Sequence, residues 1–424
     1  MRILIHGLNF APELVGVGKY TGEMAEWLAA RGHQVRAVTA PPFNPEWRVA
    51  PGFSPWRYSR EDSIRSSRFG EQLQELAVRG HLTVLRCPLW VPLRPAAPKR
   101  ILHLASFALA SFLVMLRQIR WKPEIVLVVE PTLFCLPAAL ITGRSCGATT
   151  WLHVQDFEAD AGFELGLLKS VVLRPTVEWV ERKSMSAFDR VSTISEKMLG
   201  KLVEKGIRRS VCRLFPNWVD TETIFPLPNP SPLRAELGIS TREVVALYAG
   251  TMAQKQGLEV LAEASSRMAG RNGLRFVFCG EGSGKAMLAN LTSNLANVQW
   301  IPLQPFARLN DLLNLADIHL LPQKADAADL VMPSKLTGIL ASGRPVVATA
   351  RPGTQLAQVV EGRGIVVEPG DASAFANAIE QLAVCPGLRE RLGANARDYA
   401  LSALEKESVL SRFEQELLGF AAAG

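Results

Sequence analysis

Short runs of apolar residues, rich in Val, Ile and Leu, alternate with longer amphipathic stretches along most of the chain. Short apolar runs bounded by Gly or polar residues are typical of strands buried on both faces, and amphipathic stretches are typical of helices that cover them. In the first half, strands are expected at residues 2–8, 34–39, 83–87, 124–129, 149–153, 191–194 and 212–215. In the second half, the clearest strands are expected at 244–250, 274–279 and 346–348. The alternation predicts an α/β protein with doubly wound parallel sheets.

A change in composition near the middle of the chain indicates a domain boundary. Residues Asn217–Asp220 are followed by the Pro-rich stretch Pro226–Pro232, which interrupts the alternation of strands and helices. The 424 residues correspond to two or three domains at about 150 residues per domain. We therefore expect an N-terminal domain over residues 1–218 and a C-terminal domain over 219–401. Residues 41–80, rich in Pro, Trp, Arg and Ser, are expected to form a long loop.

A helix start with anion-binding chemistry is expected just before the strand at 346–348. Ser334 is a residue type that caps the free N–H groups of a helix start, and Lys335 adds a mobile positive charge beside them. Gly343 and Pro345 then end the helix and turn the chain into the strand. A helix start of this kind at the edge of a parallel sheet predicts a diphosphate site. The alternative is an ordinary helix–strand connection without a ligand.

Glycine-rich turns follow other expected strands. The strand at 244–250 leads to Thr251 and a helix from about residue 257 to residue 268. The strand at 274–279 leads to the turn Gly280–Lys285. Strand, glycine turn, helix and strand is the order of a nucleotide-binding half of a doubly wound sheet, in which ligands bind at the carboxyl ends of the strands.

The turn after the first expected strand carries Gly16 and Gly18, which lack a Cβ atom and so allow a ligand to approach the backbone closely. This turn is not a dinucleotide-binding fingerprint, because it has no third glycine and no acidic residue ends the strand at 34–39. A Rossmann dehydrogenase is therefore disfavoured.

Five motifs, in this order, resemble those of the family-4 glycosyltransferases with the GT-B fold, and among them the type that acts in colanic acid biosynthesis. The motifs are residues 10–23, 153–160, 216–220, 248–256 and 331–345. The resemblance spans nearly the whole chain. It implies two Rossmann-like domains that face a deep cleft. It also implies that the amphipathic residues 402–424 cross back and complete the N-terminal domain on the acceptor side, while the C-terminal domain binds the donor.

The resemblance also implies a reaction. Enzymes of this type move a sugar with retention from a nucleotide sugar, here GDP-fucose, to a polyprenyl-diphosphate-linked saccharide, and no metal or other cofactor is expected. Charge builds on the departing diphosphate, so its stabilisation by cations and fixed N–H dipoles is the main task of the enzyme. Lys255 and Lys335 are the candidate cations, and the N–H groups around Gly16 and Ser334 are the candidate dipoles.

The remaining candidates come from the same resemblance. His153 ends a strand where the family places a contact to the donor sugar, and Asp156 is expected to orient His153 or to contact acceptor hydroxyls. We therefore assign catalysis to His153, Lys255 and Asp156. The donor-binding candidates are Gly16, Gly18, Thr251, Lys255, Gly280, Gly282, Ser334, Lys335 and Glu361. The ordinary alternatives are a solvated surface charge for each lysine, a structural role for the histidine, and a helix-terminal position for Asp156 and Glu361.

Two positions depart from the family pattern. Gly338 stands where many family-4 enzymes have the glutamate that holds the ribose, and Thr251 stands where they have an arginine. Diphosphate binding is therefore expected, whereas recognition of the ribose and the sugar has no evident residue. Two alternatives stay open. One is a nucleotide-sugar epimerase of the same fold, with Asp156 and Glu281 as its acid and base. The other is a non-catalytic sugar- or lipid-binding subunit of polysaccharide assembly.

Charge and composition narrow the choice of partners. A net charge of +7 and a pI near 9.2 favour contact with phosphates or anionic lipid. Nucleic acid is not an expected partner, because no helix-turn-helix, RNP or zinc-finger pattern is present. The six Cys and six His are scattered without metal-ligand spacing. This scatter indicates a cytoplasmic protein with reduced cysteines and no metal site.

One apolar segment, residues 101–116, bears on membrane binding. Its sixteen residues fall short of the roughly 20 that span a bilayer. The segment is expected to be either a helix buried in the first domain or a helix lying in the membrane interface. Its flanking residues are Lys99, Arg100, Arg117, Arg120 and Trp121. Because the expected acceptor is lipid-linked, we expect peripheral association with the inner face of the cytoplasmic membrane.

Overall fold

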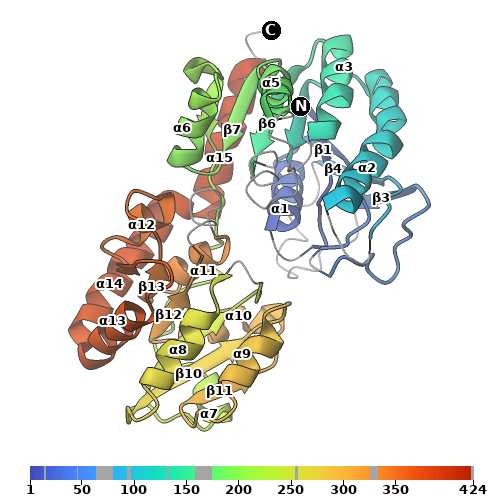
Figure 1. Cartoon of the computed structure of the whole chain (residues 1–424). Helices are drawn as coiled ribbons and strands as arrows, with labels where there is room; N and C mark the ends of the chain where they lie inside the picture. The colour runs from blue at the N-terminus through green and yellow to red at the C-terminus, as the bar shows by residue number, and fades with distance from the viewer. Residues whose placement is uncertain are drawn as a thin grey trace. The chain divides into compact units, whose positions relative to one another are not determined.

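The computed structural model describes residues 1–13, 16–44, 46–63, 80–92, 97–130, 133–157, 174–253, 256–324 and 333–421. Contacts within the chain divide it into two compact units. Unit 1 comprises Met1–Pro216 and Leu410–Gly424, and unit 2 comprises Asn217–Val409. Each unit has its own parallel sheet with helices packed on it (Figure 1). The predicted α/β class with two Rossmann-like domains is therefore confirmed.

Within the described residues, the sheet of unit 1 has eight strands in the order β3-β4-β2-β1-β5-β6-β7-β8. The strands are β1 (Arg2–Gly7), β2 (Gln34–Thr39), β3 (Ser59–Ser63), β4 (His81–Arg86), β5 (Ile125–Val129), β6 (Thr149–Val154), β7 (Arg190–Thr193) and β8 (Cys212–Leu214). Neighbouring strands are parallel except for β3 and β4. Apart from β3, each strand overlaps an apolar run in which the sequence predicts a strand.

The strand β3 lies in a stretch that the sequence analysis expects to be a loop. Its sequence, Ser-Arg-Glu-Asp-Ser, is polar throughout, because β3 is the antiparallel edge strand of the sheet. Polar cross-strand pairs replace apolar packing: the carboxylate of Asp62 accepts a hydrogen bond of 2.8 Å from Thr83 Oγ1, and the carboxylate of Glu61 pairs with Arg86. The hydropathy pattern therefore carries no sign of this strand.

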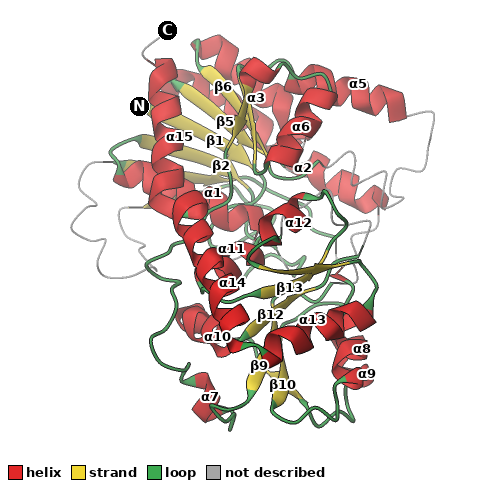
Figure 2. Ribbon diagram, turned by 90° about the vertical axis from the view of Figure 1, so that its left-hand side faces the viewer, coloured by secondary structure: helices red, strands yellow, loops and turns green. Residues whose placement is uncertain are grey.

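Helices cover both faces of this sheet. Those of unit 1 are α1 (Gly16–Ala30), α2 (Ala97–Arg117), α3 (Leu136–Cys146), α5 (Arg174–Met185), α6 (Glu196–Glu204) and most of α15 (Lys406–Ala421). In Figure 2, α15 lies along one face, and α2 and α3 lie along the other. Side chains agree with this arrangement: Trp151 of β6 contacts Phe413 of α15, whereas His6 of β1 bonds to Ser111 of α2.

The helix α2 is longer than the sequence analysis expects. The stretch Lys99–Trp121 is 23 residues long, and its length and composition would allow it to cross a membrane. One side of it packs on unit 1, because Phe107 and Met115 are fully buried and the ring of His6 lies 3.0 Å from Ser111 Oγ. The opposite side is exposed. Neither of the two predicted states, buried or interfacial, therefore describes the whole helix.

The helix α15 is anchored to unit 1 by aromatic and ionic contacts. The ring of Phe413 stacks on that of Phe215, with centroids 4.1 Å apart and an interplanar angle of 10°. The buried carboxylate of Glu414 lies 2.7 Å from His33 Nε2 and 3.2 Å from Arg31 Nη2. The C-terminal residues of the chain therefore belong to the core of its first unit.

Within the described residues, the sheet of unit 2 has six parallel strands in the order β11-β10-β9-β12-β13-β14. The strands are β9 (Val244–Ala249), β10 (Leu274–Cys279), β11 (Val298–Ile301), β12 (Ile318–Leu321), β13 (Val346–Thr349) and β14 (Gly364–Val367). The helices are α7 (Leu233–Glu236), α8 (Glu259–Arg267), α9 (Lys285–Leu291), α10 (Leu309–Leu315), α11 (Lys335–Ala341), α12 (Gln355–Val360), α13 (Ala372–Val384) and α14 (Pro386–Tyr399).

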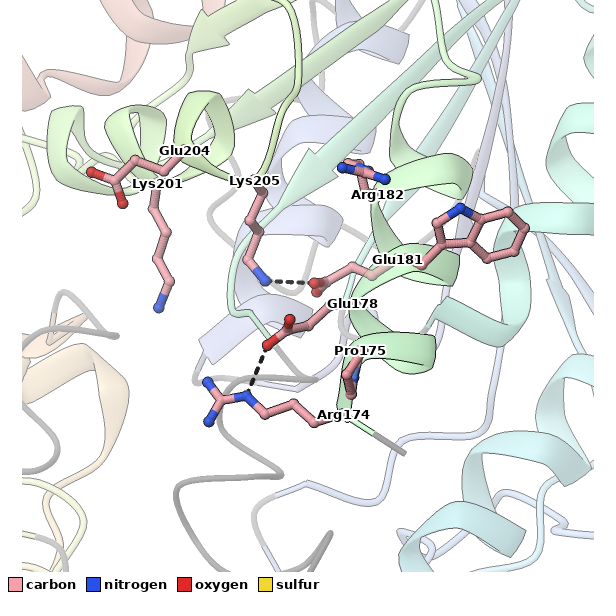
Figure 3. Close-up of a pocket in the computed structure, with 9 residues that line it drawn as sticks. Arg174, Pro175, Glu178, Glu181, Arg182, Lys201, Glu204 and Lys205 are labelled. Atoms are coloured by element: carbon pink, nitrogen blue, oxygen red, sulfur yellow. Dashed lines mark hydrogen bonds and ion pairs between the residues drawn. The ribbon is translucent and has the colours of Figure 1, made fainter. Parts of the chain in front are cut away.

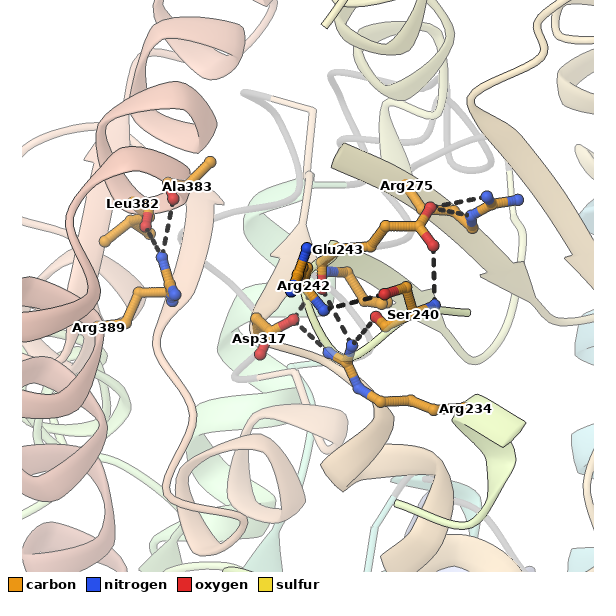
Figure 4. A network of polar contacts seen from close by, with 10 residues as sticks. Arg234, Ser240, Arg242, Glu243, Arg275, Asp317, Leu382, Ala383 and Arg389 are labelled. Atoms are coloured by element: carbon orange, nitrogen blue, oxygen red, sulfur yellow. Dashed lines mark hydrogen bonds and ion pairs between the residues drawn. The ribbon is translucent and has the colours of Figure 1, made fainter. Parts of the chain in front are cut away.

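A partly buried polar cluster closes the amino ends of β9 and β12 (Figure 4). Arg234 forms an ion pair with Asp317, and its Nη1 donates to the carbonyl oxygens of Ser240 and Glu243 at 3.1 and 3.0 Å. The same Asp317 carboxylate accepts from the N–H of Val245 at 2.8 Å. Each charge here has a partner, so the cluster stabilises this end of the sheet and leaves ligand binding to the carboxyl end.

Candidate active site

Two loops at the carboxyl end of the unit 2 sheet are joined by backbone hydrogen bonds. The N–H of Met252, after β9, donates to the carbonyl of Glu281, after β10, at 2.8 Å. The N–H of Gly284 donates back to the carbonyl of Met252, also at 2.8 Å. A Cβ atom at Gly280 would lie 2.1 Å from the Gly250 carbonyl oxygen, and one at Gly282 would lie 2.5 Å from that of Met252. Both glycines are therefore required because the loops touch each other, whether or not they also contact a donor.

Lys335 lies against the first of these loops, the one after β9. Its Nζ lies 4.2 Å from the centre of the Tyr248 ring and 3.1 Å from Gln256 Oε1. The residue beside it is Gly250, where a Cβ atom would come within 3.2 Å of the same Nζ. The expectation of a mobile surface charge is therefore wrong, because the side chain is partly buried and contacts β9 and the loop after it. Burial lowers the pKa of the Lys335 amine to about 7.

The helix start at Ser334 differs from the prediction. Ser334 has helical backbone angles, φ −58° and ψ −27°, and its side chain makes no capping hydrogen bond. Instead, its carbonyl oxygen accepts a bond of 3.0 Å from Thr337 Oγ1. The predicted serine cap is therefore wrong. The predicted end is confirmed, since α11 stops at Ala341 and Gly343 has a φ of +66° before β13 begins.

Three further donor-binding candidates of unit 2 are Lys255, Thr251 and Glu361. Lys255 lies outside the described residues, so its position stays a prediction. Thr251 is exposed, and its carbonyl oxygen accepts a bond of 2.7 Å from the buried Tyr248 hydroxyl, which holds the loop after β9. Glu361 is exposed at the end of α12. Tyr248 and Gln256 are not among the predicted site residues, and their only signal in the sequence is their place at the two ends of the motif at residues 248–256.

His153 is buried on β6 in unit 1, and both its ring nitrogens have partners inside the protein. Its Nε2 accepts a bond of 2.9 Å from the Gln155 amide, so its Nδ1 carries the proton and donates to Ser192 Oγ at 2.9 Å. Ser192 Oγ also accepts from Trp151 Nε1 at 2.8 Å. Burial lowers the pKa of His153 to about 3, so the ring is neutral near pH 7. This ring is therefore not poised to transfer protons.

Asp156 lies in the turn after β6 and is half-buried. The prediction that Asp156 orients His153 is replaced by a different arrangement, since Ser192 and Gln155 hold the ring. Ser192 belongs to the neighbouring strand β7, which is 39 residues away in the chain. The hydrogen-bond partner of His153 therefore comes from a strand whose place beside β6 cannot be read from the sequence.

The glycine turn of unit 1 is organised by a buried glutamate, Glu13. Its Oε1 accepts from the N–H groups of Phe43 and Asn44, both at 3.1 Å, and its Oε2 accepts from Asn9 Nδ2 at 2.9 Å. A Cβ atom at Gly18 would lie 2.3 Å from Glu13 Oε2. Gly18 therefore makes room for this carboxylate.

Gly16 has a different environment. It begins α1 with a φ of +63°, and a Cβ atom there would meet nothing nearer than Asn44 Nδ2 at 4.0 Å. Of the two glycines, Gly16 is therefore the one with open space around it. The carboxylate of Glu13 between the two loops is the feature that sequence reasoning missed. Its only signal was its place in the motif at residues 10–23.

A pocket of about 530 Å³ lies between α5 and α6 in unit 1 (Figure 3). Its walls carry several opposite charges in ion pairs: Lys205 Nζ lies 2.5 Å from Glu181 Oε2, and Arg174 Nε lies 2.8 Å from Glu178 Oε1. None of the candidate residues is among the described residues that line it. In the described part of the chain, no group of three or more His, Cys, Asp and Glu side chains could hold a metal ion.

Comparison with known families assigns both halves of the chain. The glycosyl transferase 4-like domain family matches residues 15–218, and the glycosyl transferases group 1 family matches residues 231–399. The chain is also 41% identical over 429 residues to WcaI of Escherichia coli (strain K12), a glycosyl transferase assigned to colanic acid biosynthesis. That alignment covers 99% of this chain and 100% of WcaI.

Solved structures show the same fold at low sequence identity. Sucrose-phosphate synthase from Thermosynechococcus elongatus aligns over 100% of both chains, with a TM-score of 0.74 and 19% identity. Anabaena HepE in complex with UDP and glucose aligns over 99% of this chain and 100% of its own, with a TM-score of 0.67 and 14% identity. Both families, the full-length relative and these folds agree. The chain belongs to the family-4-like glycosyltransferases and has their GT-B architecture of two Rossmann-like domains.

Proposed function

We propose that this glycosyltransferase moves fucose from GDP-fucose, with retention, to a polyprenyl-diphosphate-linked saccharide during synthesis of a colanic-acid-like exopolysaccharide. The identity to WcaI, assigned to colanic acid biosynthesis, supports the pathway. The complex of HepE with UDP and glucose supports a nucleotide-sugar donor. No metal or other cofactor takes part in the proposed reaction.

The observation that carries the proposal is the position of Lys335. Its amine lies at the carboxyl end of a parallel sheet, where doubly wound domains bind ligands, and its neighbours Tyr248 and Gln256 are neutral. A diphosphate would supply the negative charge that these neighbours lack. In the transition state, charge moves onto that diphosphate, so a cation held in this place stabilises the transition state more than the ground state. Lys255 is the proposed second cation.

The proposed roles of the unit 1 residues follow from their surroundings. A neutral, buried His153 is unsuited to acid–base catalysis, so we propose that it positions the turn after β6 through Gln155. Asp156, in that turn, is the proposed contact to acceptor hydroxyls. The epimerase alternative is weakened in unit 2, because the carboxylate of Glu281 is held by Lys285 at 2.5 Å.

The acceptor's lipid is proposed to bring the protein to the inner face of the cytoplasmic membrane. The outer side of α2 exposes Leu102, Leu109 and Leu113 by 60%, 77% and 61%. Trp56 and Tyr58, from the segment leading into β3, are exposed by 69% and 59%. The Tyr58 hydroxyl donates to the Ala110 carbonyl of α2 at 3.1 Å, so the aromatic and aliphatic residues form one surface.

Exposed basic residues at the two ends of α2 support a lipid partner. Lys99 lies at one end, and Arg117 and Arg120 lie at the other. Apolar side chains enter the acyl region while Trp, Tyr and basic residues stay at the headgroups, which is the usual division in interfacial helices. Each basic residue near an anionic surface contributes about 1 kcal/mol.

The proposal is tested by adding GDP-fucose, UDP-glucose and a CMP-sugar separately and measuring thermal stabilisation, followed by transfer to a polyprenyl-diphosphate-linked acceptor. We expect stabilisation by GDP-fucose and a product one fucose heavier by mass spectrometry. Conversion of the donor without acceptor would indicate an epimerase. Donor binding without turnover would indicate a non-catalytic subunit, and no binding of any nucleotide sugar would remove the proposal.

A further inference from the structure

The described groups that contact the partly buried amine of Lys335 carry no negative charge. Tyr248 presents the face of its ring at 4.2 Å, and Gln256 presents an amide oxygen at 3.1 Å. Burial raises the pKa of the Tyr248 phenol, so that group stays neutral as well. Gly250 leaves room for the amine, because a side chain there would begin 3.2 Å from it.

Lys205 is an example of a structural lysine in the same chain, because its charge is paired. Its side chain is 14% exposed, and its amine lies 2.5 Å from the buried carboxylate of Glu181. Lys285 likewise lies 2.5 Å from Glu281. A buried ammonium without a carboxylate costs free energy, because it has lost water and gained no opposite charge. Among the described residues, by contrast, the partly buried Lys335 has no carboxylate partner.

The described charged groups on the elements around Lys335 do not provide a counter-ion for its amine. On β9 the group that faces it is the phenol of Tyr248, and on the loop after β9 it is the amide of Gln256. On α14, which packs against α11, Arg397 donates to the carbonyl of Ala341 at the opposite end of the helix. Among the described residues, none of these supplies a negative charge to Lys335.

We infer that, above neutral pH, the donor binds together with a proton: Lys335 is then an uncharged amine in the free enzyme and becomes an ammonium when the diphosphate of the nucleotide sugar arrives. This inference rests on the proposed function. The proton comes from the acid form of the buffer, so one N–H bond forms on Lys335 and one bond to hydrogen breaks in the buffer. The diphosphate keeps both of its charges, because it is a diester with no ionisation near neutral pH.

Because donor binding is coupled to proton uptake by Lys335, the site would select diphosphates over neutral ligands. A neutral ligand, such as a nucleoside or a free sugar, offers no charge to balance the ammonium and does not draw the proton. A diphosphate does, and the ammonium is then present in the step in which the diphosphate departs. The pKa of about 7 for the free amine sets the conditions of the test, since proton uptake is largest above that pH.

The first measurement is calorimetric titration of the wild-type enzyme with GDP-fucose, with UDP-glucose in parallel, in phosphate and in Tris. These buffers differ in ionisation enthalpy, so the difference in heat counts the protons. We expect uptake of about one proton per donor at pH 8 and much less at pH 6. From pH 7.5 to pH 8.5 the Kd should rise about eightfold.

The second measurement identifies the residue without a mutation. The rate of acetylation of each lysine is followed by mass spectrometry against pH, with and without donor. The midpoint of the Lys335 profile should lie near neutral pH in the free enzyme and move upward by more than one pH unit with donor. The profile of Lys183, which is exposed on α5 in unit 1, is the internal control and should not move.

The possible failures are distinct. If neither nucleotide sugar binds, the proposed function fails and the inference fails with it. If a donor binds at pH 8 without proton uptake, or if the Lys335 profile does not respond to donor, the inference alone is overturned. Uptake that persists in Lys335→Met would assign the proton to another group and would also overturn it.

Discussion

Gly280 lies so close to Gly250 that a Cβ atom on Gly280 would stand 2.1 Å from the Gly250 carbonyl oxygen. The N–H of Gly250 in turn donates to the carbonyl of Cys279 at 2.9 Å. The two loops that carry the donor-binding candidates of unit 2 are therefore a single rigid piece of backbone, and Lys335 rests against it.

Gly280→Ala should destabilise unit 2 by about 2 kcal/mol or more, because a methyl group cannot fit against a backbone oxygen without displacing it. The matched control is Gly270→Ala, where a Cβ atom would meet nothing within 4 Å. Urea unfolding followed by circular dichroism measures both. Equal stability of the two variants would show that the loops separate easily.

Lys335→Ala and Lys255→Ala should each reduce turnover with the nucleotide sugar by about 100-fold, which is the scale for losing one preorganised stabiliser of developing charge. Lys335→Ala should keep its thermal stability, because the amine it removes is partly buried without a counter-ion. Steady-state kinetics with the proposed acceptor give the result, and Lys183→Ala, at an exposed position on α5 in unit 1, is the control. Wild-type turnover in either variant would exclude that lysine from the site.

Acid should destabilise the protein through its buried histidines. Burial lowers the pKa of His6, His153 and His319 from 6.5 to about 3. Between these values the unfolded chain binds protons that the folded chain does not, so the free energy of unfolding falls as pH falls below about 6.5. Each histidine contributes a slope of about 1.4 kcal/mol per pH unit.

His319→Gln tests this slope, because His319 Nε2 lies 3.1 Å from the Leu313 carbonyl and a glutamine amide can donate there without titrating. Urea unfolding at pH 7, 6 and 5 should show about one proton fewer bound on unfolding than in the wild type. An unchanged slope would mean that His319 is already protonated in the fold.

Phe413→Ala should loosen α15 from unit 1. The stacked contact with Phe215 and the edge contact with Trp151 would both be lost, at a cost of about 3–5 kcal/mol for a buried aromatic residue. Leu418→Ala on the same helix is the control, because Leu418 is 45% exposed. Limited proteolysis should cut the Phe413 variant near its C-terminus much faster. Similar cleavage of both variants would contradict the anchoring role.

Leu109→Ser with Leu113→Ser should leave the protein folded and remove its binding to anionic vesicles, because both side chains are exposed on α2. Phe107→Ser should instead unfold unit 1, because Phe107 is fully buried against the sheet. Sedimentation with vesicles of mixed anionic and neutral lipid measures binding, which salt should weaken. If the wild-type protein does not sediment with such vesicles at low salt, the membrane proposal is wrong.

The sequence predicts the fold better than it predicts the site, for a physical reason. Strands buried on both faces must be apolar along their whole length, so β5 and β9 are visible as runs of Val, Ile and Leu. The edge strand β3 needs no apolar residues and is invisible. The site depends on contacts between segments far apart in the chain, such as Ser192 with His153. Such contacts leave no periodic pattern.

The candidate residues illustrate the same limit. A lysine in a loop-and-helix motif looks like a surface charge, and only the ring of Tyr248, 87 positions earlier in the sequence, shows that Lys335 is held. Gly18 looks like a glycine that admits a ligand, yet its neighbour is the Glu13 carboxylate. The family resemblance pointed to these loops, and the packing gives several of their residues structural tasks that the resemblance does not imply.

The return of residues 410–421 to unit 1 has a consequence for biosynthesis. The ribosome delivers the first 216 residues early, but the helix that covers Trp151 and Phe215 emerges only after all of unit 2 has been translated. Until then the nascent first unit keeps an uncovered aromatic face, which a chaperone or a neighbouring nascent chain could occupy. Unit 2 is continuous in sequence and waits for no segment of unit 1, whereas unit 1, translated first, is completed only by a helix that is translated after unit 2.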